Sequence, residues 1–553
     1  MTRNVRTNLS MIFKHLQKER IKYDDILQVI NGFGVYQIIA ILLVSLPVCF
    51  DGITTMMLVF LLGDHAHRCR IPDVENDKYS ATTTDLNGTM YNSTSQCFLN
   101  LNGTEIPCKE WVYDTSIYTS TLISKFNMVC EGKFMRSHIL LSHFFGTFVN
   151  AILCGFACDK WGRKPALVVG IVLSIFPNLI RPWMPNLILV AVCEFLNAAG
   201  SNLTFVVPFM IVTELVDPGH RVLASFAIYF SYMIGEFVLL VYAYFIRDWE
   251  TLIIVVAVPI TVCFFIFVLV TESPRWLLVK GRTDEAMTIL RKIAKYNKTV
   301  INFNPQDINV KEENRVSILQ GMKLVMKSKQ MIKRFAILFF NWFSISLIYF
   351  GISMNAADLG GDVYINYLIS TIAETVGILF CFFADSFPRK KLFCPAMLIG
   401  GASCLSTIFT STYGGKSLHW LTIALAMVGK LGVTTAFFVI YLITSEVFPT
   451  SIRASMFGLC SMAARIGGMT SSYIGKLGVL LESGYGVALP LIIFGSVGTI
   501  AGLLSLLLPE TRNIELPETF KEALHINKMD ESTDSISQEK LEMSKMISDV
   551  EAT

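Results

Sequence analysis

Residues Gly155–Lys164 have the sequence GFACDKWGRK, a charged turn that separates two apolar runs at residues 138–158 and 165–184. Each run has about 20 residues, the length that a helix needs to cross the hydrocarbon core of a bilayer. A weaker copy of the turn, Asp385–Lys391 (DSFPRKK), follows another apolar run in the second half of the chain. One charged turn at matching places in two halves indicates an internally duplicated membrane protein.

Apolar runs long enough to span a bilayer recur about twelve times along the chain. Their expected limits are 36–62, 138–158, 165–184, 187–213, 222–246, 250–270, 335–357, 363–385, 391–411, 418–446, 452–477 and 484–508. The composition agrees, because 53% of the residues are hydrophobic and 16% are charged, whereas soluble domains carry about a quarter charged residues. The sequence therefore predicts an all-α polytopic membrane protein with twelve transmembrane helices.

Polar segments divide the chain into successive parts. These are a cytoplasmic N-terminal segment (1–35), a six-helix bundle (36–270) with an extracellular loop (63–135), a cytoplasmic linker (271–334), a second six-helix bundle (335–508) and a cytoplasmic tail (509–553). Within the linker, Asp284–Ala294 has helical spacing with acids first and bases last, an order that suits the helix dipole. We therefore expect short amphipathic helices in the linker.

Positively charged residues decide on which side of the membrane each loop lies. Six basic residues precede the first span, and others fill the turns at 160–164 and 389–391. Because cytoplasmic loops carry the excess of Lys and Arg, both termini are predicted to be cytoplasmic and the 63–135 loop extracellular. The net charge of +3 is too small to indicate a nucleic acid as a partner.

The predicted extracellular loop has the features of an oxidising, glycosylating compartment. Three glycosylation sequons begin at Asn87, Asn92 and Asn102. The same loop contains four cysteines, Cys69, Cys97, Cys108 and Cys130. We predict glycosylation at these asparagines and two disulfides, for which three pairings are open.

Charged residues recur at the cytoplasmic ends of the helices in both halves, and this pattern resembles the major facilitator superfamily, in which such charges form a cytoplasmic gate. In this interpretation Gly155 lets a neighbouring helix approach, and Asp159 pairs with a helix terminus or with an Arg elsewhere in the bundle. An acid and a base separated by seven positions recur after the fourth and tenth spans. The predicted gating residues are Gly155, Asp159, Arg163, Glu214, Arg221, Asp385, Arg389, Glu446 and Arg453. The alternative is a set of ordinary membrane anchors, and the repetition in both halves favours the gate.

Four longer strings are more specific. They are Trp111–Thr115 (WVYDT), Thr271–Leu278 (TESPRWLL), Ser445–Arg453 (SEVFPTSIR) and Leu508–Thr511 (LPET). Together with the large first loop, these strings resemble solute carrier family 22, the organic cation, anion and zwitterion transporters of the major facilitator superfamily. The resemblance implies two six-helix bundles around a central site, alternating access, a plasma membrane location and transport rather than enzymatic activity.

Within that family, the carnitine and organic zwitterion branch is the most similar. The likeness lies in Phe50-Asp51-Gly52, in Ala243–Trp249 and in Gly429–Phe437. The chain departs from the branch at Asp51, where those members usually have Asn. An extra acid in the first span adds attraction for a substrate amine, for Na⁺ or for a proton. The alternative is a polar contact between Asp51 and a neighbouring Ser or Thr.

Ionisable side chains inside the spans are costly and therefore mark candidate functional sites. The resemblance implies that Glu374 lies near the substrate path. It also implies that Arg465 occupies a position where anion and zwitterion members have Arg and cation members have Asp. A solute with both an ammonium and a carboxylate would satisfy this acid and this base. The alternative is that Glu374 and Arg465 form a salt bridge with each other.

Aromatic rings can bind an ammonium by cation–π attraction, and they extend the candidate site. The predicted substrate-binding residues are Asp51, Glu374, Arg465, Tyr349, Tyr232 and Glu236. For Glu236, positions facing a cavity and facing lipid remain open. Two further buried charges, Glu194 and Lys430, are expected to be structural or gating residues without direct contact to the substrate.

The expected substrate is a small zwitterion such as carnitine, a betaine or a β-amino acid derivative. The alternatives are a carrier of plain organic cations, an organic anion exchanger and a receptor that binds without transport. Ile378 counts against the exchanger, because anion members tend to have Lys there. The chain has neither a phosphate-binding loop nor a zinc-site spacing. We therefore predict no cofactor and no metal; Na⁺ or H⁺ coupling stays open, the lipid bilayer is the surrounding partner, and no oligomeric state is predicted.

Overall fold

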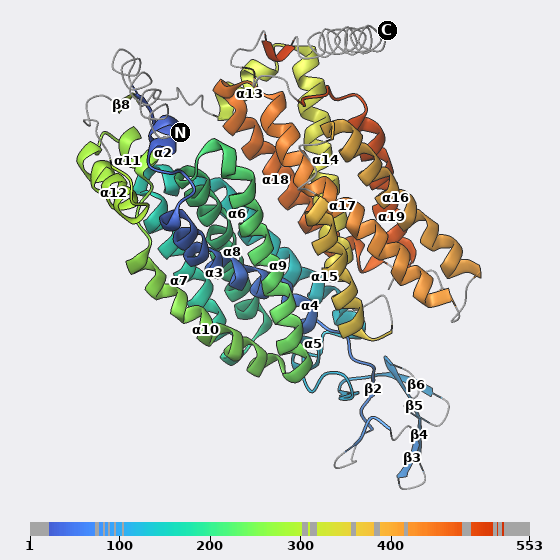
Figure 1. Cartoon of the computed structure of the whole chain (residues 1–553). Coiled ribbons are helices and arrows are strands. Elements are labelled where there is room, and N and C mark those ends of the chain that lie inside the picture. Colours follow the sequence, from blue (N-terminus) through green and yellow to red (C-terminus); the bar gives the residue numbers. More distant parts are fainter. Residues whose placement is uncertain are drawn as a thin grey trace, which may run out of the picture. The chain divides into compact units, whose positions relative to one another are not determined.

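The computed structural model describes residues 21–71, 77–80, 83–86, 89–92, 96–101, 104–300, 308–309, 318–355, 361–380, 387–413, 418–477, 488–512, 517 and 522–524. Long helices dominate it (Figure 1). They are α3 (Val35–Met56), α6 (Met135–Trp161), α7 (Arg163–Ile180), α8 (Leu187–Leu215), α9 (Arg221–Phe245), α10 (Trp249–Leu269), α14 (Lys329–Met354), α15 (Val363–Phe380), α16 (Arg389–Tyr413), α17 (His419–Val447), α18 (Thr450–Ile474) and α19 (Ala488–Ser505).

Shorter elements connect the long helices. The short helices are α2 (Tyr23–Val29), α4 (Leu58–Leu61), α5 (Leu122–Lys125), α11 (Pro274–Val279), α12 (Thr283–Tyr296) and α13 (Ile318–Val325), with 3₁₀ turns η1 (Cys130–Phe134), η2 (Arg181–Trp183) and η3 (Pro218–His220). The predicted amphipathic helix in the linker is confirmed as α12, which buries Met287, Leu290 and Ile293 along one face.

Each of the twelve predicted spans coincides with one of the long helices. Within the described residues, ten helices are long and apolar enough to cross a bilayer. The other two predicted spans are α10, whose described apolar stretch is the shorter Trp249–Phe265, and α18, which contains Arg465 and several serines. The prediction of an all-α polytopic membrane protein is therefore confirmed.

The predicted extracellular loop forms small antiparallel sheets, which the sequence did not predict (Figure 1). Strand β2 (His67–Cys69) pairs with β7 (Trp111–Tyr113). A meander joins β3 (Thr83–Leu86), β4 (Thr89–Asn92), β5 (Phe98–Leu101) and β6 (Thr104–Pro107). The four cysteines pair as Cys69–Cys108 and Cys97–Cys130. Asn87, Asn102 and the side chain of Asn92 lie outside the described residues, so glycosylation stays a prediction.

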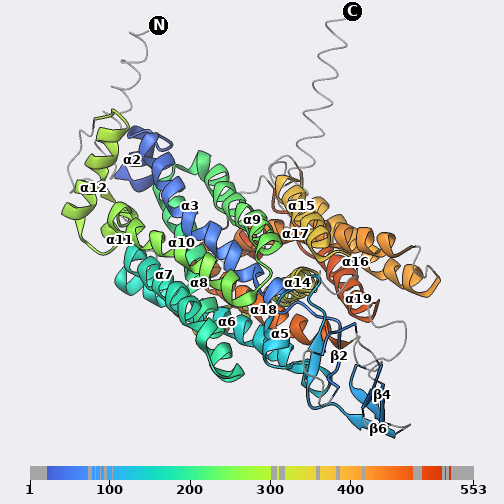
Figure 2. The ribbon, with the colours of Figure 1, turned by 90° about the horizontal axis from the view of Figure 1, so that it is seen from below.

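The chain divides into two compact units, and each is described by itself. Unit 1 consists of Met1–Met57, Val149–Tyr242 and Glu250–Glu313. Its main packing is α7 on α8 and α3 on α8, and Figures 1 and 2 both show α7 beside α8. A Cβ on Gly200 would lie 2.6 Å from the backbone nitrogen of Ser174, so this glycine allows α7 and α8 to approach closely. A short parallel pairing joins β1 (Ile21–Lys22) to β8 (Ile308–Asn309).

Unit 2 consists of Leu58–Phe148, Ala243–Trp249 and Asn314–Thr553. Within it α16 packs on α17 and α19, while α14 packs on α18 and α15 on α17 (Figure 2). This division splits α6 after Phe148 and differs from the boundaries at 270 and 335. The arrangement as two six-helix bundles therefore stays a prediction from the sequence pattern.

Candidate functional site

Arg163, at the first position of α7, is bound by an acid from another helix. Its Nη2 lies 2.8 Å and its Nε 3.2 Å from the two carboxylate oxygens of Glu214, on the last turn of α8. Two parallel bonds between a guanidinium and a carboxylate give both strength and orientation. Asp159, one turn earlier on α6, lies 3.5 Å from Arg163 Nη1. The charged turn of unit 1 therefore contains a three-residue ionic cluster.

A second acid occupies the amino end of α7. Glu272 accepts hydrogen bonds from the backbone nitrogens of Arg163 at 2.9 Å and Lys164 at 3.2 Å. A carboxylate at a helix amino terminus satisfies unpaired N–H groups and interacts favourably with the helix dipole. The residue before the helix, Gly162, has φ +107°, and a Cβ there would overlap Glu272 Oε2. Glycine is therefore required at this turn.

Unit 2 contains the same construction around Arg389, at the start of α16. Glu510 accepts from the backbone nitrogens of Arg389 at 2.8 Å and Lys390 at 3.1 Å. Arg389 Nη2 lies 3.4 Å from Glu446 Oε1 on α17, and Thr511 donates to the other oxygen of Glu446. Each half thus places one acid on the arginine side chain and another on the helix amino terminus.

Some details of the predicted gate are wrong. Glu214 and Glu446 bind the arginines of the charged turns rather than the bases seven positions further on. Arg221 instead pairs with Asp24 at 2.7 Å, and Arg453 Nε donates to the carbonyl of Phe448. In each case the chain turns between the two residues, so the acid and the base lie on different helices.

The expected close approach at Gly155 is also absent. Among the described residues, no heavy atom lies within 4 Å of a Cβ built on Gly155. Asp385 lies outside the described residues. The gating role of the remaining residues stays a prediction.

A buried ion pair lies inside unit 2, away from the charged turns. Glu374 on α15 and Lys430 on α17 are 3% and 2% exposed, and Lys430 Nζ lies 2.8 Å from Glu374 Oε2. Tyr349 on α14 donates its hydroxyl to Glu374 Oε1 at 2.5 Å. Lys430 also bonds Ser370 Oγ at 2.8 Å and lies 5.4 Å from the centre of the Tyr349 ring. An ammonium therefore already lies between a carboxylate and an aromatic face.

Aromatic rings of α14 and α17 continue from this ion pair within unit 2. Tyr349 contacts Phe350 and Phe437, with ring centres 5.0 and 5.6 Å apart. Tyr441 stacks on Phe437 and packs against Trp342, whose indole donates to Thr444. Such a surface can bind the apolar and cationic parts of a small solute.

Arg465 on α18 does not form the alternative salt bridge with Glu374. Glu374 pairs with Lys430 instead. Within the part of the chain that the structure describes, Arg465 has no ion pair, and its buried Nε has no hydrogen-bond partner. The sequence analysis expected Lys430 to be a structural or gating residue without contact to the substrate. Its pairing with Glu374 depends on how α15 packs on α17.

In unit 1, Asp51 on α3 is 7% exposed and is bonded by hydroxyl groups. Ser201 Oγ on α8 donates to Asp51 Oδ1, and Thr55 Oγ1 lies 3.3 Å from the same oxygen. The other predicted residues of this unit lie on α9, where Tyr232 packs edge-on against Phe205 and Glu236 is buried. The structure thus brings Tyr349 and Glu374 together and places Asp51 in a separate cluster.

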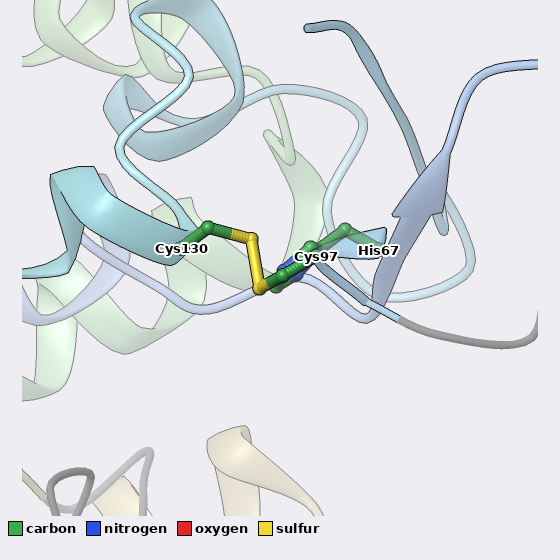
Figure 3. Close-up of side chains that lie close together, drawn as sticks. All are labelled: His67, Cys97 and Cys130. Atoms are coloured by element: carbon green, nitrogen blue, oxygen red, sulfur yellow. A yellow bond between two sulfur atoms is a disulfide. The ribbon is translucent and has the colours of Figure 1, made fainter. Parts of the chain in front are cut away.

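One further group in unit 2 combines His67, Cys97 and Cys130 (Figure 3). The two sulfur atoms are bonded to each other as a disulfide. Metal binding by cysteine requires free thiolates, so this group does not form a metal site.

Comparison with known proteins also indicates a membrane transporter. The sequence profile of the "sugar (and other) transporter" family matches residues 89–522. The chain is 31% identical to an organic cation transporter protein of Drosophila melanogaster, over 92% of this chain and 95% of that protein. It is 28% identical to the human organic cation/carnitine transporter 2, over 92% and 95%, and 27% identical to mouse solute carrier family 22 member 4, over 90% and 94%.

Among solved structures, the xylose transporter XylE from E. coli in a partially occluded inward-open conformation is similar. It aligns with a TM-score of 0.56 over 88% of this chain and 100% of that chain, at 16% identity. At this identity the likeness shows the fold alone.

Proposed function

Since this chain belongs to the organic cation transporters of solute carrier family 22, within the major facilitator superfamily, we propose that it carries small organic zwitterions across the plasma membrane. The expected solutes carry one ammonium and one carboxylate, as carnitine, betaines and β-amino acid derivatives do. The observation that carries this proposal is the buried pair of Glu374 and Lys430 beside the ring of Tyr349.

Binding of a plain cation at this pair requires an unfavourable exchange of partners. Its ammonium must displace Lys430 from Glu374, which leaves the lysine charge buried without its carboxylate. Breaking a buried pair in this way costs about 3–5 kcal/mol. The free energy of binding a plain cation is therefore partly lost.

A zwitterion can insert into the same pair without that loss. Its ammonium binds Glu374 and Tyr349 in place of the lysine, and its carboxylate accepts bonds from Lys430. Both protein charges keep a partner of opposite sign, and the aromatic rings that include Phe437 contact the rest of the solute. Arg465 supplies a second base in the same unit for the carboxylate.

Transport would proceed by alternating access, in which the two halves rearrange around the bound solute. The matching clusters at Arg163 and Arg389 support this mechanism, because each can open and close one half in the same way. The excess of basic residues near both clusters supports cytoplasmic termini and a gate on the cytoplasmic side.

The test is uptake into proteoliposomes of carnitine and of a quaternary ammonium of similar size that lacks the carboxylate. Glu374→Gln should weaken both solutes, because both present an ammonium. Lys430→Gln should lower the affinity for carnitine by about 30-fold or more, the effect of losing about 2 kcal/mol of binding free energy. The affinity for the plain cation should stay the same or increase.

Lys327→Gln, at an exposed lysine of the linker, serves as the control for a loss of positive charge. If Lys430→Gln lowers uptake of both solutes in the same proportion, selection through the carboxylate is wrong. A wild-type protein that prefers the quaternary ammonium would identify a carrier of plain cations instead.

A further inference from the structure

The disulfide between Cys97 and Cys130 lies beside a buried histidine in the first loop (Figure 3). One ring nitrogen of His67 is within 4.8 Å of both sulfur atoms. His67 is 6% exposed, whereas both cysteines are half-buried. A base therefore lies close to a bridge that the surrounding chain does not cover completely.

The hydrogen bond of His67 decides which of its nitrogens can accept a proton. Nδ1 lies 3.0 Å from the carbonyl oxygen of His65. Because a carbonyl oxygen only accepts, Nδ1 donates and carries the proton of the neutral ring. Nε2 is then the basic nitrogen, and it is buried without a hydrogen-bond partner in the part of the chain that the structure describes. A buried polar atom without a partner is costly and calls for an explanation.

Cys130 is held in an unusual backbone conformation. Its φ is +52°, in the left-handed region that residues with a Cβ rarely adopt. Surrounding contacts must hold such a residue in place, and the bond to Cys97 is one of them. Strained or exposed disulfides are the ones that are reduced most easily. The Cys130 sulfur also lies 3.5 Å from the carbonyl oxygen of Gln96, to which the thiol of the reduced form can donate.

The other disulfide of the loop, between Cys69 and Cys108, provides an internal comparison. Cys69 is 1% exposed, and it lies on β2, which is paired with β7. Neither cysteine has a positive φ. Among the described residues, no histidine forms a comparable group with these two sulfur atoms. We therefore expect this second bridge to be purely structural.

We propose that Cys97–Cys130 is a thiol–disulfide exchange site for small aliphatic thiols outside the cell, with His67 as its acid–base group. The incoming thiol gives its proton to His67, directly or through one water, and its thiolate attacks one sulfur of the bridge. The S–S bond breaks, and its electron pair leaves on the other sulfur, which takes the proton from His67. The products are a mixed disulfide and one free protein thiol.

A second small thiol can complete the reduction. It attacks the mixed disulfide, so that Cys97 and Cys130 both become thiols and the two small molecules leave as their own disulfide. Cys97 directly precedes β5, whereas Cys130 begins η1, which leads into α6. Once the bridge is open, the sheet and the start of α6 are covalently joined only through the chain between them. This consequence concerns the loop and does not depend on which solute is carried.

The test uses purified full-length protein whose free thiols have first been blocked with N-ethylmaleimide. Reduced glutathione is added, and the thiols that form are labelled over time with an isotopically heavy maleimide and identified by peptide mass spectrometry. Cys97 and Cys130 should be labelled faster than Cys69 and Cys108 by about tenfold or more, a difference of about 1.4 kcal/mol in the barrier. A glutathione adduct should be found on Cys97 or Cys130.

His67→Gln should slow the opening of this bridge by about tenfold or more, because a positioned acid–base group contributes a factor of this size or larger. It should leave the rate at Cys69–Cys108 unchanged. His138→Gln, at an exposed histidine of the same unit, is the control and should behave as the wild type.

Two results would overturn the proposal. The exchange site is wrong if glutathione does not open Cys97–Cys130, or opens it no faster than Cys69–Cys108. The role of His67 is wrong if the bridge opens in His67→Gln at the wild-type rate or faster, since faster opening would mean that the histidine only packs the loop.

Discussion

Arg163 and Glu214 are joined by two hydrogen bonds, of 2.8 and 3.2 Å, although they lie 51 positions apart in the chain. Arg389 and Glu446 repeat this pairing in the second half at 3.4 Å. In both halves the arginine also begins a helix whose amino end is covered by a further acid, Glu272 or Glu510. Each arginine therefore holds the ends of three segments relative to one another. The predicted gating role requires this property.

Removing a charge from the cluster around Arg163 should change the rate of transport more than the affinity for the solute. We expect Arg163→Ala to slow turnover strongly, because Glu214 then loses its partner while the Glu374 site is untouched. Asp159→Asn should do the same more mildly, since Asp159 lies 3.5 Å from the guanidinium. Equilibrium binding and initial rates of uptake on the same preparation measure the two effects. Weakened binding with normal turnover would contradict the gating role.

The acids at the helix amino termini should contribute to stability. We expect Glu272→Gln and Glu510→Gln each to lower the free energy of unfolding by about 0.5–2 kcal/mol, the range for loss of a helix cap. Gly162→Ala should cost more than Glu272→Gln, because its φ of +107° is unfavourable for alanine and its Cβ would displace Glu272. Thermal unfolding in detergent measures these changes. Glu110→Gln, at an exposed ion pair, is the control and should have little effect.

The sequence predicted the features that depend on local composition. The length of an apolar run decides whether it spans the bilayer, and therefore all twelve helices were found. The partners of the buried charges were not found, because they depend on tertiary packing. Glu374 meets Lys430 only through the contact of α15 with α17, and a shift of one residue in either helix would change the facing side chain.

The sheets of the first loop were missed for a similar reason. Their strands have three or four residues and contain many polar side chains, for example Thr83–Leu86, so no alternating apolar pattern marks them. Pairing between neighbouring strands, together with the two disulfides, holds this region. The positions of the cysteines predicted that bridges exist but left the pairing open.

The first loop, residues 63–135, should lose stability in mild acid. Burial lowers the pKa of His65 from its usual value of 6.5, although a hydrogen bond to the carbonyl of Asp114 opposes the shift. A base with a lower pKa in the folded state binds protons more tightly when unfolded. Its contribution to stability is therefore full above the unfolded pKa and decreases as the pH falls below about 6.5. Limited proteolysis of the first loop across this pH range measures the effect.

His65→Gln should flatten that pH dependence, because glutamine does not titrate there. His138→Gln, at an exposed histidine of the same unit, should leave it unchanged. A pH profile that is the same in His65→Gln and in the wild type would assign the effect to another group.

The extracellular position of the first loop should be visible as glycosylation. Treatment with an N-glycosidase should increase the gel mobility of protein expressed in animal cells, because three sequons begin between Asn87 and Asn102. Replacing all three asparagines with glutamine should give the same mobility without treatment. An unchanged mobility would contradict the orientation derived from the basic residues.

Arg465 provides the sharpest test of how the solute carboxylate is bound. It forms no ion pair with a described residue, so Arg465→Ala should leave surface expression close to that of the wild type. If Arg465 binds the carboxylate, the variant should weaken carnitine by about 30-fold or more and spare a quaternary ammonium of similar size. Arg465→Asp should shift the preference further toward the plain cation.

Combining Arg465→Ala with Lys430→Gln then shows whether the two bases share one ligand. If both bases bind the same carboxylate, the double variant should lose less binding free energy for carnitine than the two single variants lose together. If Arg465→Ala lowers transport of both solutes equally at normal surface expression, Arg465 does not bind the carboxylate.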